Sequence, residues 1–596
     1  MKESGLRCRG GIWPHWIVII GVALAAGMVR PTSLPLALTT GPAATDASFV
    51  ADVAALVRGG NATVRMPSDL AEDASGLVYV ALRDDGGRVA EAWREDGDAN
   101  RALAAALADA RAALDSAAAA RVDVVEAVIG RGAQEVGIVD SRPQVDNAQR
   151  GIVGLSIAAP DGGRLHAGPT EMIAENTSFD RVVERWLDDG ELHDASLATA
   201  DAQLFAATQF LVDLSTGQVR RITRGNEVVE PASVNRETTA QLAEGMAGWL
   251  FNQLDTSGRL AYEYWPSRGE ASSENNMIRQ WMGTLAVTRV AVDRGDETLL
   301  MRSARNVEFN LNDSYTVEDG LGAIADPDGD VKLGAVALAA LAISQHPDRE
   351  RFAEEEAALR RTVDHLWQAD GSFRTFLVPA DRNDNQNFYP GEALLLWAST
   401  LEDEADPDLL RRFMLSFEYY RDWHREGPNP AFVPWHTMAY EKVWRVTRDE
   451  RLRDFVFEMN DWLVGIQQRD DAPYPDMAGR FYAPDRPEYG PPHASSDGVY
   501  MEGLIAAYRL AEAVGDEGRA DAYRVAMVRG LRHLMQLQFV DEVDLFYISR
   551  SERVAGGIRT TEYDNRIRVD NVQHGLLAVL DILERFDPED YILESR

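Results

Sequence analysis

The sequence predicts a multidomain protein: an N-terminal α+β domain followed by an all-α double ring of helices, an (α/α)6 toroid. Before about residue 235, short apolar runs alternate with polar residues, as is typical of strands. After about residue 237, apolar residues recur every three or four positions, as on helices. We therefore expect a targeting segment at 1–45, the α+β domain at 46–235 and the toroid at 236–596.

The first 45 residues have the order of a secretory signal. Lys2, Arg7 and Arg9 precede an apolar stretch at 16–29, and a segment rich in proline and threonine follows it. Because this stretch is shorter than the roughly 20 residues that span a bilayer, we expect a signal peptide, with an uncleaved membrane anchor as the alternative. In both cases the rest of the chain is expected to be exported, to a periplasm or cell envelope.

The region at 46–235 is predicted to be an α+β domain with a mostly antiparallel sheet. Alternating apolar runs at 77–83, 122–129 and 152–158 predict strands, and an alanine-rich stretch at 102–114 predicts a helix. No phosphate-binding glycine loop, nucleophile elbow or cluster of histidine and cysteine occurs in it. Its function is therefore not legible from the sequence; capping the toroid, binding glycan and contacting a partner all stay open.

Helical periodicity predicts twelve helices after residue 236. Their expected spans are 238–253, 275–292, 297–311, 331–345, 350–369, 390–402, 407–424, 432–447, 450–468, 495–515, 518–539 and 571–585. The connections into the even-numbered helices are mostly long and rich in aromatic and polar residues, whereas the others are mostly short. A helical hairpin with one short and one long connection, repeated six times, places all the long loops on one face.

Composition separates the helices into two rings. The segment at 331–343 is apolar nearly all round, which suits an inner helix packed on both sides, whereas 350–367 carries a charged face that suits an outer helix. Over about residues 237–596 this alternation resembles the (α/α)6 toroids of the six-hairpin glycosidase superfamily, with no specific family identified. The resemblance implies a glycoside hydrolase, a polysaccharide lyase or a sugar epimerase, although a fold does not by itself fix a function.

The long loops and the first turns of the inner helices predict a carbohydrate cleft. They mix aromatic rings with carboxylates, amides, arginine and histidine. Sugar rings stack on aromatic faces and their hydroxyls need polar partners, so this mixture suits a saccharide. The candidate substrate-binding residues are Tyr262, Trp265, Arg279, Trp281, Asn387, Trp435, His436, Tyr482, His493, Tyr500, Arg568 and His574.

Acidic residues at the starts of inner helices are the catalytic candidates. Hydrolysis of a glycosidic bond needs two carboxyl groups that flank it, and we expect them among Glu392, Asp497 and Asp570, with Glu502 and Glu263 in reserve. Each could instead act only as a helix cap or as a partner of the helix dipole. A helix N-terminus also lowers a carboxyl pKa, so the general acid would need burial or a like-charged neighbour.

Two other functions remain open from the sequence. A lyase or epimerase acting on uronic acids would use histidine or tyrosine as a base, for which His436, Tyr440 and His493 are candidates. Arginine and asparagine would then neutralise the substrate carboxylate, and the candidates are Asn275, Asn276, Arg279, Asn385, Asn387 and Arg568. A non-catalytic envelope protein that binds glycan is the third possibility.

Charge and cysteine content limit the partners and cofactors. The 596 residues include 60 Lys and Arg against 96 Asp and Glu, a net charge of −36, so nucleic acid is not an expected partner. The one cysteine, Cys8, precedes the apolar stretch, so neither a disulfide nor a cysteine-based metal site is expected in the mature protein.

Asp326, Asp328 and Asp330 resemble the start of a calcium loop but lack its closing glutamate. We expect no cofactor and no metal, a carbohydrate substrate, and at most a membrane tether through the N-terminal segment.

Overall fold

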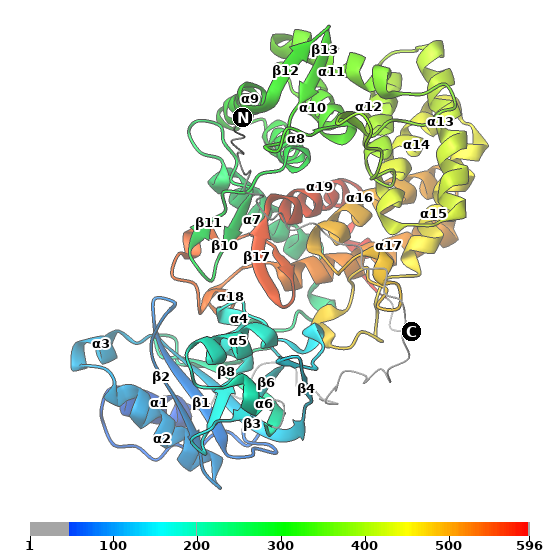
Figure 1. The fold of residues 1–596 in the computed structure, drawn as a ribbon. Coiled ribbons are helices and arrows are strands. Elements are labelled where there is room, and N and C mark those ends of the chain that lie inside the picture. Colours follow the sequence, from blue (N-terminus) through cyan, green and yellow to red (C-terminus); the bar gives the residue numbers. More distant parts are fainter. Residues whose placement is uncertain (1–46, 198–199, 594–596) are drawn as a thin grey trace, which may run out of the picture.

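The computed structural model describes residues 47–197 and 200–593, and Figure 1 shows two regions stacked on one another. A β-rich region, called the N-terminal domain below, precedes residue 236. A helical toroid follows it. The predicted signal segment lies outside the described residues. Within the described ranges, no helix combines the length and the apolar character that crossing a membrane requires.

The N-terminal domain is built on a seven-stranded antiparallel sheet. Its order is β2-β1-β3-β8-β6-β7, and β9 pairs with β8. The strands are β1 (Leu77–Asp84), β2 (Gly87–Glu95), β3 (Val124–Glu135), β6 (Val153–Ala158), β7 (Arg164–Ala167), β8 (Ala202–Asp213) and β9 (Gln218–Arg221). The runs predicted at 77–83, 122–129 and 152–158 are strands, as their content of β-branched residues favours.

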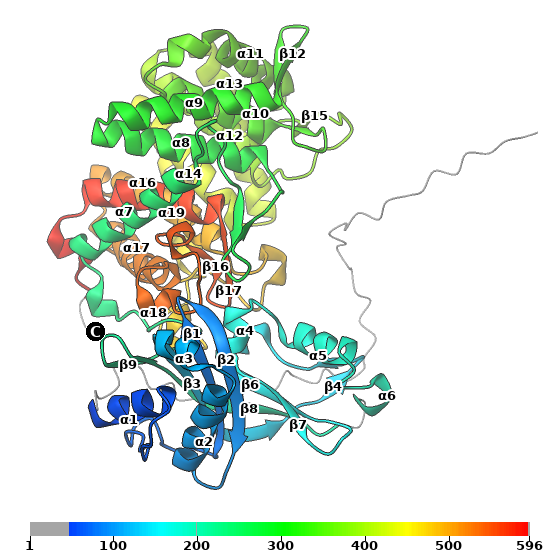
Figure 2. The same ribbon diagram turned by 90° about the vertical axis from the view of Figure 1, so that its left-hand side faces the viewer.

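Helices cover both faces of this sheet. On one face, α1 (Ala47–Val57) and α2 (Ala99–Ala112) bury Phe49 and Leu103 against strand residues such as Val80. On the other, α4 (Pro169–Ala174) and α5 (Phe179–Asp188) pack on the β6 end of the sheet. Figure 2 shows α1 and α2 on the side away from α5. The result is an α+β domain with an apolar core on each face of the sheet.

Six helices form the closed inner ring of the toroid. They are α8 (Met277–Arg294), α10 (Leu333–Gln345), α12 (Tyr389–Asp403), α14 (Val433–Thr447), α16 (Ala494–Val514) and α19 (Val569–Arg585). Each contacts the next, and α19 returns to contact α8, which closes the ring. Every residue of α10 from Leu333 to Ile343 is buried, as expected for a helix packed on all sides.

Six further helices surround this ring. They are α7 (Arg236–Gln253), α9 (Glu297–Ser314), α11 (Ala353–Leu366), α13 (Pro407–Glu426), α15 (Glu450–Val464) and α17 (Glu517–Leu537). From α9 to α17, each packs on the inner helix that precedes it, whereas α7 packs on α19 and α8. The twelve helices confirm the predicted (α/α)6 toroid, and their ends lie within a few residues of the expected spans.

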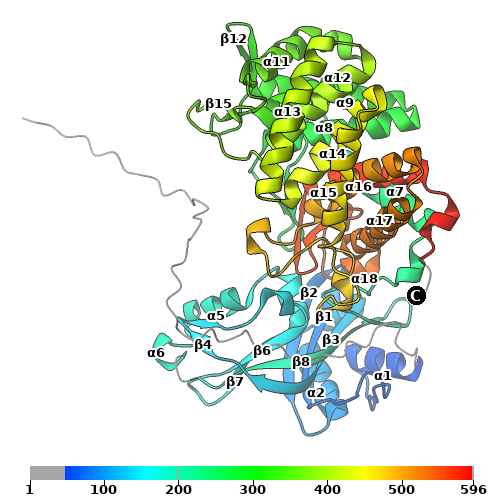
Figure 3. The same ribbon diagram turned by 90° about the vertical axis from the view of Figure 1, so that its right-hand side faces the viewer.

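The N-terminal domain contacts one sector of the toroid. Figures 2 and 3 show the sheet below the ring, on the side of α17 and α18 (Glu542–Leu545). Arg83 of β1 lies over the Phe546 ring, 5.1 Å from its centroid. Ile173 and Ile222 of the N-terminal domain share a core with Phe546 and Ile548 of the toroid. The two regions are therefore joined by apolar packing as well as by the chain.

Candidate active site

A cavity of about 310 Å³ lies at the mouth of the toroid formed by the N-termini of the inner helices. Its lining comes from the N-terminal turns of α8, α12, α14, α16 and α19 and from the loops before α12, α14 and α16. Residues that are 298 positions apart in the chain, Asn276 and His574, both line it. Inner-helix N-termini thus converge on one cavity, as the pattern of long loops predicts.

Glu392 is a buried carboxyl group in the wall of this cavity. It lies in the first turn of α12, is 2% exposed, and lines the cavity beside Tyr389. A Cβ on Gly334 of α10 would lie 1.9 Å from Glu392 Oε2, so only glycine leaves room for this carboxyl group. Among the described residues, none offers Oε2 a hydrogen bond. Burial raises the pKa of Glu392 to about 8. Glu392 is therefore mainly protonated at neutral pH and can donate a proton.

This raised pKa predicts how stability depends on pH. The folded protein holds the Glu392 proton more tightly than the unfolded chain, whose carboxyl pKa is near 4.5. The contribution is therefore fully present below about pH 4.5 and is lost as the pH rises to about 8, at about 1.4 kcal/mol per pH unit. We expect Glu392→Gln to remove this slope. Urea unfolding of both proteins at several pH values between about 5 and 8 checks it. If the free energy of unfolding depended on pH in the same way in both proteins, the prediction would be wrong.

Asp570 is an ionised carboxylate at the same cavity. It lies in the first turn of α19, is 2% exposed, and is held by two guanidinium groups. Arg279 Nε lies 2.9 Å from its Oδ2, and Arg568 Nε donates to its Oδ1 at 2.9 Å. Burial alone would raise the pKa of Asp570, but Arg279 and Arg568 outweigh it and hold the pKa far below its usual range. Asp570 therefore stays charged and orients Arg279, which also donates to the Tyr262 hydroxyl.

His574, one turn after Asp570 on α19, forms a dyad with Glu502 of α16. His574 Nδ1 lies 2.6 Å from Glu502 Oε1, and the imidazole lines the cavity. The Glu502 carboxyl is buried on α16, one turn below the cavity residues of that helix, and burial raises its pKa although His574 counteracts this. The Trp435 ring packs edge-to-face on His574 at 5.8 Å. A carboxylate that fixes Nδ1 leaves Nε2 as the atom available for proton transfer.

The remaining lining suits a polar ring with apolar faces. Aromatic side chains from three helices and two loops border the cavity: Phe388, Tyr389, Trp435, Tyr489 and Tyr500. Amide and hydroxyl groups lie among them: Asn276, Asn385, Ser495, Ser496 and Gln573. Aromatic faces and convergent polar groups together are the lining that a saccharide requires.

The structure brings eight of the residues named from the sequence to the cavity. Six come from the main site prediction and two, Asn276 and Asn385, from the lyase alternative; the six are Glu392, Asp570, Arg279, Trp435, Tyr500 and His574. Two more touch these residues from behind: Tyr262 accepts from Arg279, and Arg568 holds Asp570. This grouping supports the prediction of one polar and aromatic cleft at the inner-helix N-termini.

Asp497 lies outside the cavity lining, although its helix borders the cavity. Its Oδ1 accepts a hydrogen bond from the Phe481 backbone N–H at 2.7 Å, and its Oδ2 lies 3.2 Å from His533 Nδ1. Asp497 is 2% exposed, and both oxygens point to these partners. The structure therefore places Asp497 in a buried charge network beneath the cavity.

Six predicted binding residues also lie outside the lining. Trp281 and His436 are fully buried, and His436 Nδ1 lies 2.9 Å from the Phe432 carbonyl oxygen while its ring stacks on Phe432. His493 Nδ1 caps α16 by accepting from the Ser495 N–H. The other three are Trp265, Asn387 and Tyr482. Of the reserve carboxylates, Glu263 lies on β10 (Glu263–Trp265), 3.4 Å from Arg566.

Some residues of the cavity lining were not predicted from the sequence. Tyr389 precedes Glu392 by three positions, and Gln573 follows Asp570 by three, so the helical spacing from a predicted site residue was an available signal for both. Met282 and Val499 carry no comparable signal, because apolar residues at helical spacing usually belong to the core.

Comparison with known proteins gives only distant matches. No protein-family profile matches the chain, and no curated protein sequence matches it. Among solved structures, it is similar to a D-mannose isomerase over 60% of this chain and 100% of the other, with 14% identity and a TM-score of 0.45. A sugar epimerase from a ruminal bacterium matches over 59% and 99%, with 11% identity and a TM-score of 0.43. An alpha-1,6-mannanase from Salegentibacter sp. HEL1_6 matches over 58% and 98%, with 10% identity and a TM-score of 0.41.

Proposed function

We propose that this chain is a glycoside hydrolase in which Glu392 is the general acid and the His574–Glu502 dyad is the general base. One observation carries the proposal. A carboxyl group that is protonated at neutral pH and an imidazole fixed by a carboxylate line the same cavity. Acid–base catalysis needs one group that gives a proton and another that takes one, held in the same site.

The proposed reaction uses water as the nucleophile. His574 Nε2 takes a proton from water, the water oxygen attacks the anomeric carbon, and Glu392 gives its proton to the departing glycosidic oxygen. The bond from the anomeric carbon to that oxygen breaks, and the products together gain one water. Both protein groups recover their starting protonation by exchange with solvent. Since water attacks directly, the anomeric configuration inverts.

Asp570 has a supporting role in this proposal. Its oxygens are engaged by Arg279 and Arg568, and its pKa lies far below the operating pH, so it is a weak base. It instead fixes Arg279 at the cavity wall, where the guanidinium can donate to sugar oxygens. The expected export belongs to the same proposal, because a periplasmic or envelope location gives access to polysaccharides.

Product analysis tests the reaction class. We expect the purified protein, incubated with neutral and uronic-acid glycans, to release fragments that have gained water, as detected by mass spectrometry. Proton NMR of the first-formed product should show inversion at the anomeric carbon. Unsaturated fragments would establish elimination instead and overturn hydrolysis. Absence of any product across the panel would favour a glycan-binding protein.

The His574–Glu502 dyad specifically favours a second candidate, an epimerase or isomerase. Removing a proton from carbon requires a positioned base, and the same acid and base can move a proton between two carbons without water addition. Incubation of mono- and disaccharides in D2O separates this candidate from hydrolysis. Deuterium bound to carbon in a product of otherwise unchanged mass would establish it.

A further inference from the structure

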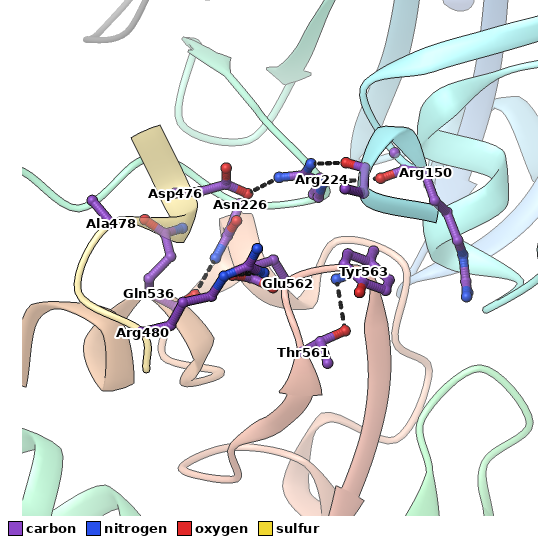
Figure 4. Close-up of polar contacts among 12 residues, drawn as sticks. Arg150, Arg224, Asn226, Asp476, Ala478, Arg480, Gln536, Thr561, Glu562 and Tyr563 are labelled. Atoms are coloured by element: carbon purple, nitrogen blue, oxygen red, sulfur yellow. Dashed lines mark hydrogen bonds and ion pairs between the residues drawn. The ribbon is translucent and has the colours of Figure 1, made fainter. Parts of the chain in front are cut away.

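Arg224 anchors the N-terminal domain in the toroid through a fully buried ion pair. Its side chain is 0% exposed, and one guanidinium nitrogen contacts the Asp476 carboxylate, whose side chain is 1% exposed (Figure 4). Its Nε donates to the Arg150 carbonyl oxygen at 2.9 Å, and another nitrogen donates to the Ala148 carbonyl oxygen. Three contacts from one planar group fix both sides of the junction.

Neighbouring contacts extend this junction. Asn226 Nδ2 donates to the Gln536 carbonyl oxygen at 2.7 Å, and Arg532 Nε donates to the Val229 carbonyl oxygen at 2.8 Å. Tyr474 and Met477 of the toroid belong to the same apolar core as α5 of the N-terminal domain. Buried charges, satisfied amides and a shared core are features of a permanent interface rather than of a hinged module.

The loop at 475–482 carries this anchor to the cavity wall. Asp476 is at one end of the loop, and the Phe481 N–H at the other end donates to Asp497 in the first turn of α16 at 2.7 Å. The Phe481 ring packs edge-to-face on Tyr500, a cavity residue, at 5.6 Å. Gly479 between them has φ +100°, and a Cβ there would lie 2.1 Å from the Arg529 carbonyl oxygen. The loop is thus held tightly against α17.

Buried charges fix the same loop a second time. Arg480 Nη1 lies 3.0 Å from Glu562 Oε1, and Figure 4 shows the two side chains meeting between the loop and the strand end. His533 bridges Glu562 and Asp497, at 3.2 Å from each. These side chains are nearly or fully buried, so Arg480, Glu562, His533 and Asp497 form one charge network from the loop to α16.

A separate route runs along β17 (Asp564–Arg568). Asn176 of the N-terminal domain donates to Asp564 Oδ1 at 3.0 Å, and Asn565 Nδ2 donates to the Ile173 carbonyl oxygen at 2.9 Å. Arg568 lies at the other end of β17 and donates to Asp570 at the cavity. The two ends of this short strand therefore link the N-terminal domain to a second part of the wall.

We propose that the N-terminal domain is a positioning element of the cavity, which holds the wall at Tyr500 through Arg224 and Asp476 and the wall at Asp570 through Asn176 and β17. Among the described residues, none of the N-terminal domain holds the far wall, where Glu392 lies, in this way. This inference deepens the proposed function and rests on it only for its kinetic test. Arg224, Asp476 and Asn176 are positioning residues that do not touch the cavity.

Hydrogen–deuterium exchange of the full chain tests the inference without a substrate. The variant Arg224→Met with Asp476→Asn removes both charges together, so that no buried charge is left unpaired. We expect exchange at 481–500 to become at least about tenfold faster, with exchange in α10 and α12 unchanged. Asn176→Ala, at the milder second contact, should affect 564–570 in the same way.

Arg221→Met is the matched control. Arg221 is a largely buried arginine whose Nη2 pairs with Asp69 at 2.6 Å, wholly inside the N-terminal domain. We expect it to leave exchange at 481–500 unchanged. Faster exchange confined to 475–478 in the double variant, or equal acceleration in α10 and α12, would overturn the inference.

Kinetics supply the second readout. On a glycan that the wild type turns over, the double variant should raise KM several-fold while kcat changes by less than about twofold, because the wall binds substrate and leaves the acid and base in place. Unchanged KM and kcat would overturn the inference. If the wild type acts on no glycan but exchange at 481–500 is faster in the double variant, the proposed function is wrong and this inference is still supported.

Discussion

Replacing Glu392 by glutamine is expected to lower kcat by about 10²- to 10⁴-fold while substrate binding is retained. Glutamine keeps the shape of the side chain, but it cannot give a proton to the departing oxygen. Since Gly334 leaves only enough room for this group, the cavity should keep its form in the variant. Steady-state kinetics gives kcat. Isothermal titration calorimetry of the variant with a glycan that the wild type cleaves gives the dissociation constant of the substrate.

The pH profile of the wild type extends this prediction. Only the protonated form of Glu392 can act as the acid, and burial raises the pKa of this group to about 8. Activity should therefore fall as the pH rises through about 8. Glu441→Gln is the matched control, because Glu441 is also buried, with a pKa raised by burial, but lies outside the cavity lining. Glu392→Gln turning over at the rate of Glu441→Gln would show that Glu392 is not the acid.

The helices of the toroid could be predicted from the sequence because the surroundings of each helix determine the spacing of its apolar residues. An inner helix such as α10 must be apolar on all sides, whereas an outer helix such as α11 needs one charged face. Both patterns can be recognised in the sequence. The unequal connections then indicate which ends of the helices meet. The location of the cavity follows from these two local signals.

The division of roles within the cavity could not be predicted in the same way. Glu392 and Asp570 both lie in the first turns of inner helices. Among the described residues, however, Glu392 is buried without an ionic partner, whereas Asp570 lies between two arginines. Their pKa values move in opposite directions for that reason, and only packing in three dimensions decides it. Asp497 has the same local signature but is turned to Phe481 and His533, which arrive from other segments.

Replacing His574 by asparagine is expected to lower kcat by about 10²- to 10⁴-fold, because no other imidazole is held at this cavity wall among the described residues. Asparagine is polar but cannot accept and release a proton near neutral pH. His365→Asn, on the exposed face of α11, is the control and should leave kcat unchanged. Kinetics of the two variants on the same glycan provides the comparison.

The dyad makes a further distinction within this prediction. Glu502 does not line the cavity and acts through His574, so Glu502→Gln should lower kcat less than His574→Asn does, and should add little in the double variant. Such non-additivity arises because Glu502 has no role once the imidazole that it orients is gone. Effects that multiply in the double variant would mean that Glu502 and His574 act independently. In that case the base of the reaction is not the dyad, and Asp570, despite its two arginines, becomes the remaining ionised carboxylate of the cavity lining.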